Sequence, residues 1–145
     1  MITLLQRVSE ASVSVDGACI GRIDRGLLAL VAVHRDDQSA DVSRMAERIL
    51  GYRMFPDDQD RMNKSVSELR LGLLLVPQFT LAADTKKGTR ASFTKAAEPA
   101  KGVACFDELV GICRNHLERV ETGQFGANMQ VALINDGPVT FWLES

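Results

Sequence analysis

Two apolar segments constrain the fold of this 145-residue chain more than any other feature. Residues 27–33 and 72–76 contain no polar side chain, and neither run alternates between polar and apolar positions. Short continuous apolar runs are typical of β-strands buried on both faces. We therefore predict that both segments are buried strands of a sheet.

Further strands are expected toward both ends of the chain. The patterns predict them at residues 1–9, 12–16, 18–23, 53–55, 128–134 and 139–143. Asp16-Gly17 is the expected tight turn between two of them. Residues 135–138, Asn-Asp-Gly-Pro, read either as a hairpin turn or as a place where glycine permits close approach of the backbone.

Two amphipathic helices are predicted between the strands. Ser39 caps the first helix and Gly51 ends it. Pro99 begins the second helix, which continues to about Leu117. The apolar stripe of the second helix consists of Val103, Phe106, Leu109, Val110 and Cys113. We therefore predict an α+β fold, a β-barrel-like sheet with helices packed outside it, in a single domain over residues 1–145.

Composition and motifs exclude several classes of function. No apolar run is long enough to span a membrane and no secretory signal is present, so a cytoplasmic protein is expected. The chain lacks the GxSxG, HExxH, P-loop and GxGxxG motifs. Three cysteines without a CxxC pair, together with two histidines, make a metal site improbable, and no cofactor is expected. Cys105 and Cys113 read as core residues.

The charge is uneven although its net value is only −2. Between Asp84 and Lys101 the chain has five basic and two acidic residues. The basic residues are Lys86, Lys87, Arg90, Lys95 and Lys101. This segment either contacts nucleic-acid phosphates or is an ordinary solvated loop.

The polar residues that follow the second apolar run are candidates for a site. Pro77, Gln78, Phe79 and Thr80 come directly after this buried strand, where polar groups often line a binding site. Thr80 is a nucleophile, a hydrogen-bond donor or simply a strand former. A nucleophilic threonine needs a base, and none is apparent in the sequence.

Four segments together resemble D-aminoacyl-tRNA deacylases, in register and from end to end. They are Gln6-Arg-Val8, Gly51-Tyr-Arg53, Gln78-Phe-Thr-Leu-Ala-Ala-Asp84 and Asn135-Asp-Gly-Pro-Val-Thr-Phe-Trp142. The resemblance implies a homodimer with a barrel-like fold that hydrolyses the ester of D-aminoacyl-tRNA, and of mischarged glycyl-tRNA, in translation quality control. It implies that Gln78, Phe79 and Thr80 form the catalytic site.

The resemblance also assigns roles to residues outside that site. It implies that Gly137 and Pro138 form a glycine–cis-proline motif that reaches into the partner's pocket and rejects L-aminoacyl-tRNA, and that Arg7 braces this motif. Two departures from the family pattern are Pro77 in place of serine and Ala91 in place of proline. Pro77 removes a hydroxyl and a backbone N–H beside the site, and Ala91 loosens a loop.

An aminoacyl ester is already activated, so the expected mechanism needs little catalytic machinery. The neighbouring ribose hydroxyl assists the attack of water, and backbone N–H groups near Gln78 to Thr80 stabilise the oxyanion. Lys86, Lys87, Arg90 and Lys95 are expected to face the tRNA acceptor end without reading bases. Two alternatives remain: an esterase with Thr80 as nucleophile, and a nucleic-acid-binding module without catalysis.

Overall fold

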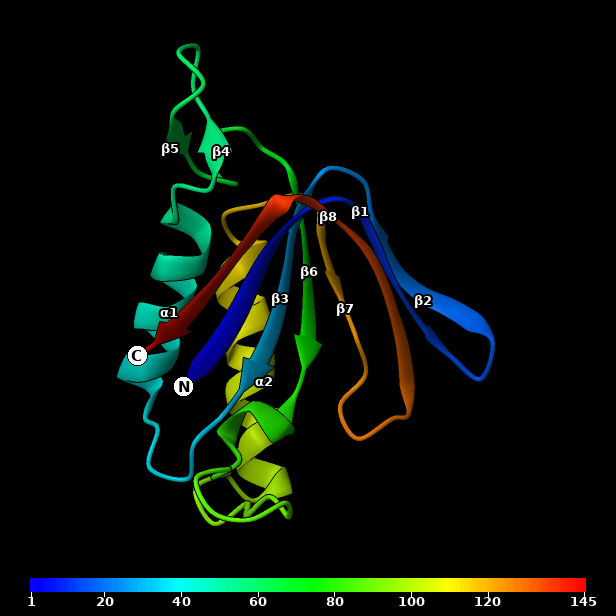
Figure 1. Cartoon of the computed structure of the whole chain (residues 1–145), viewed down its shortest axis with the longest axis vertical. Coiled ribbons are helices and arrows are strands. Elements are labelled where there is room, and N and C mark those ends of the chain that lie inside the picture. Colours follow the sequence, from blue (N-terminus) through cyan, green and yellow to red (C-terminus); the bar gives the residue numbers. More distant parts are fainter.

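A six-stranded sheet forms the centre of the computed structural model, which describes residues 1–145 (Figure 1). The strands β2 (Ala18–Ile23), β1 (Ile2–Val15), β3 (Gly26–Ala32), β6 (Gly72–Pro77) and β7 (Val120–Thr122) follow one another across the sheet. The last strand, β8 (Met129–Glu144), pairs with β1 along almost its whole length. Both β3–β6 and β6–β7 are parallel pairs, whereas the pairings of β1 are antiparallel.

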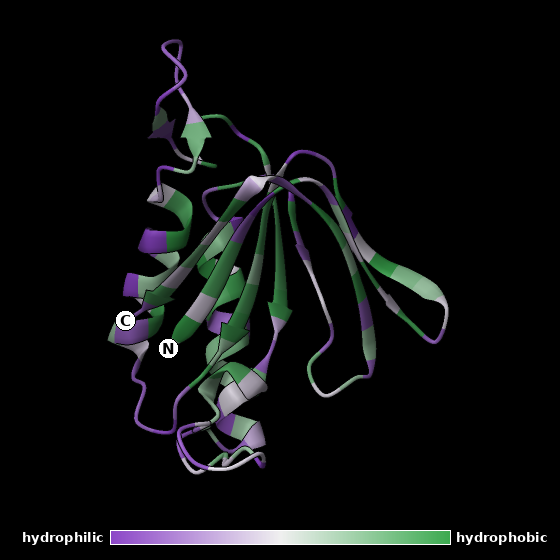
Figure 2. Ribbon diagram, viewed as in Figure 1, coloured by the Kyte–Doolittle hydropathy of each residue, from purple (hydrophilic) through white to green (hydrophobic).

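The two apolar runs form the adjacent strands β3 and β6, as predicted. Nearly every residue of both strands is buried, and Figure 2 shows them as hydrophobic along their length. Helices α1 (Ser39–Gly51) and α2 (Pro99–Arg114) cover one face of these strands (Figure 1). The main core between helices and sheet includes Leu5, Leu27, Ile49, Leu75 and Leu109.

The sheet curls so that β2 comes back against β6 and β7, which encloses a second core. A Cβ on Gly21 of β2 would lie 3.1 Å from the carbonyl oxygen of Thr122 and 3.4 Å from Leu74. The enclosed cluster consists of Val8, Ala11, Val13, Ile23, Leu28, Leu74 and Val76. The prediction of a barrel-like sheet with helices outside is therefore confirmed, and neither helix is long and apolar enough to cross a membrane.

Long strands replace several of the predicted short ones. The strands predicted at residues 1–9 and 12–16 are one strand, β1 (Ile2–Val15), because β8 pairs with almost its whole length while β3 and β2 share its other edge. Residues 135–138 are not a hairpin turn. They form an irregular stretch inside β8, which continues to pair with β1 beyond them.

The helix boundaries differ in detail from the prediction. Gln38, not Ser39, is the N-cap of α1, because the Asp41 carboxylate accepts the N–H of Gln38 at 2.9 Å. Val103 is exposed rather than part of the buried stripe of α2, and this helix ends at Arg114. A small hairpin of β4 (Phe55–Pro56) and β5 (Met62–Lys64) projects from the molecule beyond α1 (Figure 1). The sequence indicated a strand at residues 53–55 but missed β5 and β7.

Candidate functional site

A cavity of about 550 Å³ opens where β6 ends. Its wall combines the end of β6, the start of α2, the loop between β7 and β8, and the first residues of β8. The lining residues are Val76, Pro77, Gln78, Phe79, Ala97, Pro99, Phe125, Gly126, Ala127, Met129 and Val131. The size and the mainly apolar lining with a few polar groups are typical of a site for a small molecule or for the end of a larger one.

Gln78 and Phe79 line this cavity because β6 changes direction at Pro77. The N–H of Gln78 still donates to the carbonyl of Val31 on β3, at 2.7 Å. A short 3₁₀ helix, η1 (Phe79–Ala82), begins immediately afterwards. Thr80 is exposed beside the cavity rather than part of its wall, and its Oγ1 accepts a hydrogen bond of 2.6 Å from Nε2 of Gln78.

The start of η1 presents backbone donors next to the cavity. The N–H of Leu81 donates to the carbonyl of Gln78, and that of Ala83 to the carbonyl of Thr80. The N–H groups of Phe79 and Thr80 come first in the helix, so they have no acceptor within it. Pro77 has no N–H to add. Two adjacent amide donors are therefore available to an oxygen atom bound near Phe79.

The cavity wall has no ionisable side chain. The groups whose pKa clearly departs from its ordinary value lie elsewhere. Backbone N–H donors lower the pKa of the exposed carboxyls of Asp57 and Glu68, and burial raises the pKa of the Cys105 and Cys113 thiols. No three His, Cys, Asp or Glu side chains converge as they do around a metal ion. The polar groups that this chain itself places at the cavity are therefore backbone amides and the side-chain amide of Gln78.

Gly137 and Pro138 lie at the irregular stretch of β8 and are joined by a cis peptide bond. Both residues are exposed, and Gly137 has a φ of +156°. A Cβ on Gly137 would lie 2.5 Å from Cγ2 and 2.6 Å from the backbone nitrogen of Val139, so glycine is required there.

Side chains hold this stretch of β8 from both sides. Oδ1 of Asn135 accepts the N–H of Val139 at 2.7 Å, and its Nδ2 donates to Oγ1 of Thr140 at 2.9 Å. Arg7 donates from Nε to the carbonyl of Asp136 at 2.8 Å and from a terminal nitrogen to the carbonyl of Met54 at 2.7 Å. Gly137 and Pro138, which we call the Gly-Pro tip, are therefore exposed to solvent on a backbone that is held in place.

Within one chain the Gly-Pro tip does not meet the cavity. The strand register places Pro77 beside Val31, and Val31 opposite Thr3 of β1. The tip lies beside Arg7, because Arg7 donates to the carbonyl of Asp136. Arg7 is four residues along β1 from Thr3, a distance of about 13 Å in a strand. Figure 1 shows the same separation: β6 ends at the lower end of the sheet, and β8 bends at the upper end.

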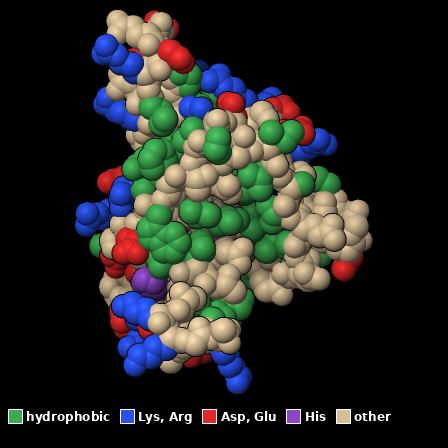
Figure 3. Space-filling view, viewed as in Figure 1, with side chains coloured by type: hydrophobic (Ala, Val, Ile, Leu, Met, Phe, Trp, Pro, Cys, Tyr) green, Lys and Arg blue, Asp and Glu red, His purple; other side chains and the backbone are tan.

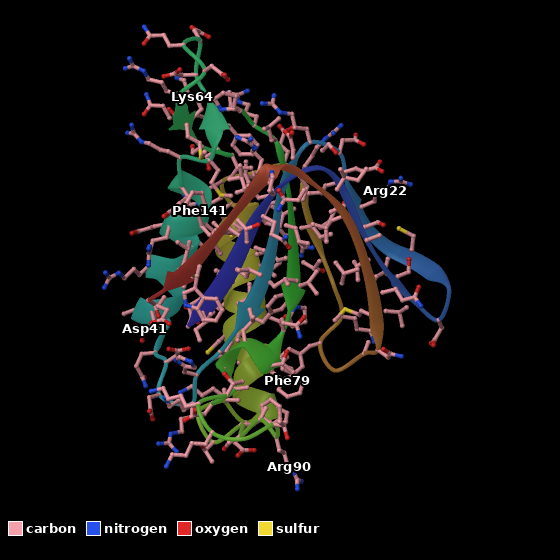
Figure 4. All side chains as sticks on the ribbon, viewed as in Figure 1. Arg22, Asp41, Lys64, Phe79, Arg90 and Phe141 are labelled. Carbon is pink, nitrogen blue, oxygen red and sulfur yellow. The ribbon has the colours of Figure 1, made fainter.

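The basic residues of the predicted tRNA-binding segment lie at the cavity end of the molecule. Lys86, Lys87, Arg90 and Lys95 are exposed, and they belong to the loop between η1 and α2. Figure 4 places Arg90 at the outer edge of this loop, at the same end as Phe79. None of the four forms a salt bridge.

Sequence reasoning missed the loop between β7 and β8 as part of the wall. Phe125, Gly126 and Ala127 line the cavity, yet this segment has no polar motif. The position of the loop depends on Gly123, because a Cβ there would lie 2.8 Å from Sδ of Met129 and 3.3 Å from Pro77. Only glycine lets this loop approach the end of β6.

The chain matches the family model described as D-Tyr-tRNA(Tyr) deacylase over residues 4–144. A D-aminoacyl-tRNA deacylase from Alkalilimnicola ehrlichii is 61% identical over 145 residues, which cover 100% of this chain and 97% of the relative. One from Methylococcus capsulatus is 62% identical over 143 residues, which cover 99% and 94% of the two chains.

Solved structures share the fold. The "c-Myc DNA Unwinding Element Binding Protein" is 35% identical with a TM-score of 0.96, over 100% of this chain and 99% of that one. A probable eukaryotic D-amino acid tRNA deacylase has a TM-score of 0.86 at 18% identity, over 99% and 98% of the two chains, which supports the fold alone. The chain therefore belongs to the D-Tyr-tRNA(Tyr) deacylase family, whose activity is hydrolysis of the ester bond in D-aminoacyl-tRNA.

Proposed function

We propose that this chain hydrolyses the ester of D-aminoacyl-tRNA in the cavity beside Gln78 and Phe79, and that Gly137 and Pro138 of the partner subunit complete this site. The observation that carries the proposal is the combination of two features. The cavity has no ionisable groups, and the rigid Gly-Pro tip is too far from the cavity of its own chain to contact it. Because aminoacyl-tRNA is a reactant of translation, the proposed place of action is the cytoplasm.

The chemistry requires positioning and two hydrogen-bond donors. The carbonyl oxygen of the ester becomes an oxyanion when water attacks. In this mechanism the N–H groups of Phe79 and Thr80, which have no acceptor within η1, stabilise it. The free ribose hydroxyl next to the ester assists the attack of water. In this mechanism Gln78 and Thr80 orient the ribose, and no side chain has to act as a base.

Two features support a symmetric homodimer. The Gly-Pro tip and the cavity lie at opposite ends of the sheet, so two antiparallel copies could each complete the other's site. Hydrophobic side chains also gather at the centre of the sheet face that the helices leave uncovered (Figure 3). Leu30, Met129, Val131 and Leu133 on the second core cluster are only partly buried in a single chain. A second copy would cover them.

In this proposal the site selects D-amino acids by steric exclusion of the L side chain. D- and L-aminoacyl esters differ by the exchange of hydrogen and side chain at one carbon. The backbone of the partner's Gly137 fills the position of an L side chain, and it cannot rotate away as a side chain could. Glycine has no side chain to exclude, so glycyl-tRNA also enters. Lys86, Lys87, Arg90 and Lys95 contact phosphates of the acceptor end.

The direct test is deacylation of one tRNA charged with the D- or the L-form of the same amino acid, or with glycine. We expect release of the D-amino acid and of glycine, with the L-ester decaying only at its rate without enzyme. Equal hydrolysis of the D- and L-esters would contradict the role of the Gly-Pro tip.

One structural relative favours a second candidate function, nucleic-acid binding without catalysis. That relative, 35% identical to this chain, is named for binding a DNA element. A pure binder would leave the D- and L-esters intact in the same assay. An esterase with Thr80 as nucleophile has less support, because the only hydrogen-bond partner of the Thr80 hydroxyl is the amide of Gln78, which is not a base.

A further inference from the structure

Two exposed aromatic rings stand together outside the mouth of the cavity. The side chains of Phe79 and Phe93 are 56% and 42% exposed. Their ring centroids are 5.2 Å apart and their planes are tilted by 50°. Phe79 belongs to the cavity wall and Phe93 does not, so Phe93 continues an apolar surface from the cavity toward solvent.

The backbone holds Phe93 in this position. Asp84 and Ser92 exchange two hydrogen bonds, of 2.7 Å and 3.1 Å, which close the loop between them. On the other side of Phe93, Arg35 donates to the carbonyl of Thr94 at 3.2 Å and the N–H of Arg35 donates to the carbonyl of Lys95 at 3.0 Å. The ring is therefore presented from a fixed frame, which reduces the entropy lost when a ligand stacks on it.

The closed loop carries basic side chains that no salt bridge pairs. Lys86, Lys87 and Arg90 lie between the two paired residues, and none forms a salt bridge. The carboxylate of Asp84 accepts the backbone N–H of Lys86 at 3.0 Å. Figure 3 shows Lys and Arg side chains gathered at this lower end of the molecule.

Exposed aromatic rings beside unpaired cations are the combination that binds single-stranded nucleic acid. Bases stack on the rings, and the cations lie along the backbone phosphates. A cavity of about 550 Å³ accommodates one nucleoside with its aminoacyl group. The next nucleotide must then lie outside the cavity, on the side where Phe93 is.

We propose that Phe93, supported by Phe79, stacks the base of the nucleotide that precedes the terminal adenosine of aminoacyl-tRNA, with Lys86, Lys87 and Arg90 at the adjoining phosphates. This inference rests on the proposed function. It adds a base contact to a segment that was expected to contact phosphates alone, and the contact tolerates any base because stacking does not read base edges.

The test compares two substrates that differ by this nucleotide, a D-aminoacyl-adenosine and the corresponding D-aminoacyl-cytidylyl-adenosine. For Phe93→Ala we expect KM for the dinucleotide ester to rise between about 5-fold and about 100-fold, while kcat and the kinetics of the adenosine ester stay unchanged. Phe93→Tyr retains the wild-type values. Phe93→Leu, which keeps the apolar area without the ring, behaves as Phe93→Ala.

Salt dependence supplies a second measurement. The affinity for a CCA oligonucleotide without an aminoacyl group falls as salt increases. In the double variant Lys86→Ala, Lys87→Ala, the slope of log affinity against log salt concentration decreases in magnitude by about 1.4. Phe93→Leu weakens binding of the same oligonucleotide without changing that slope.

Different outcomes contradict different parts. Equal losses on both esters, or no loss on either for Phe93→Leu, would overturn the stacking proposal. An unchanged slope in the double lysine variant would overturn the phosphate contacts. Failure of the wild-type chain to hydrolyse either ester or D-aminoacyl-tRNA would instead reject the proposed function.

Discussion

At the scale of single residues, Thr80 separates two mechanisms. Its hydroxyl accepts a hydrogen bond from Gln78 and has no base beside it. We expect Thr80→Ala to lose about 1 kcal/mol of transition-state stabilisation, which is less than tenfold in rate. If Thr80 were the nucleophile, the same substitution would lower the rate by a factor on the order of 10³–10⁶.

The matched control is Thr80→Ser, which keeps the hydroxyl and should retain wild-type kinetics. The companion substrate is a D-aminoacyl-tRNA whose terminal adenosine lacks the 2′ hydroxyl, and the unaltered enzyme should hydrolyse it far more slowly. An inactive, folded Thr80→Ala with normal turnover of the 2′-deoxy substrate would show that Thr80 is the nucleophile.

Gly137 has no room for a side chain. A Cβ there would meet Val139 at 2.5 Å, so Gly137→Ala must displace the Gly-Pro tip. A displacement of about 1 Å in a catalytic site can cost about 100-fold in rate, and we expect at least that loss of D-aminoacyl-tRNA hydrolysis.

The helical Gly111 provides the matched control, because a Cβ there meets nothing within 4 Å. Gly111→Ala should keep full activity and gain up to about 1 kcal/mol of stability. Circular dichroism and thermal unfolding would show whether both variants keep the fold. Unchanged kinetics and D/L discrimination in Gly137→Ala would remove the Gly-Pro tip from the mechanism.

At the scale of elements, α2 packs through one narrow stripe. Leu109 is fully buried between α2 and the sheet, whereas Val103 on the same helix is 37% exposed. We expect Leu109→Ala to lower the free energy of unfolding by about 2–5 kcal/mol and Val103→Ala to change it by at most about 0.5 kcal/mol. Urea unfolding of both variants measures the difference. Similar losses would mean that α2 docks through a different face.

The same helix contributes a buried thiol with a pH signature. Burial raises the pKa of Cys113 from 9.0 to about 12. The unfolded thiol ionises near pH 9 while the folded one stays neutral, so this contribution to stability is complete below pH 9 and is lost as pH rises toward 12.

Cys113→Ala should therefore lose less stability than the wild type between pH 9 and pH 11, and Cys19→Ala, which changes an exposed thiol, should follow the wild type. Denaturant midpoints at several pH values make the comparison. Parallel pH profiles for all three proteins would contradict the burial of this thiol.

Elements with strong local patterns were predictable, and those defined by pairing were not. The apolar runs of β3 and β6 and the stripe of α1 follow from hydrophobic periodicity. β7 has three residues and forms because β6 offers a parallel edge, which its own sequence does not indicate. The irregular stretch of β8 resembled a turn, since the pairing with β1 that carries the strand through it is a long-range contact.

The sequence indicated one part of the candidate site and not the other. Gln78, Phe79 and Thr80 stood out because polar residues follow a buried strand, and family resemblance drew attention to Gly137 and Pro138. The loop of Phe125 and Ala127 was not predictable, because its place in the cavity wall depends on how closely Gly123 lets it approach β6.

At the scale of the whole molecule, the proposed mechanism makes one copy insufficient. The cavity and the Gly-Pro tip lie about 13 Å or more apart along β1, on elements that the sheet fixes. Partly buried side chains on the uncovered sheet face are available to an interface. We therefore expect a dimer at working concentrations in sedimentation, and an active monomer would contradict a site shared between subunits.

The most direct measurement is complementation between two variants that are each inactive. Ala127→Trp fills the cavity but keeps the tip, and Gly137→Ala damages the tip but keeps the cavity. In a mixed dimer, one site combines the intact cavity of one subunit with the intact tip of the other. Refolding the variants together at equal concentration should restore about a quarter of wild-type D-aminoacyl-tRNA hydrolysis, because half of the dimers are mixed and each has one good site. If the cavity and tip of one chain formed the site, the mixture would stay as inactive as its components.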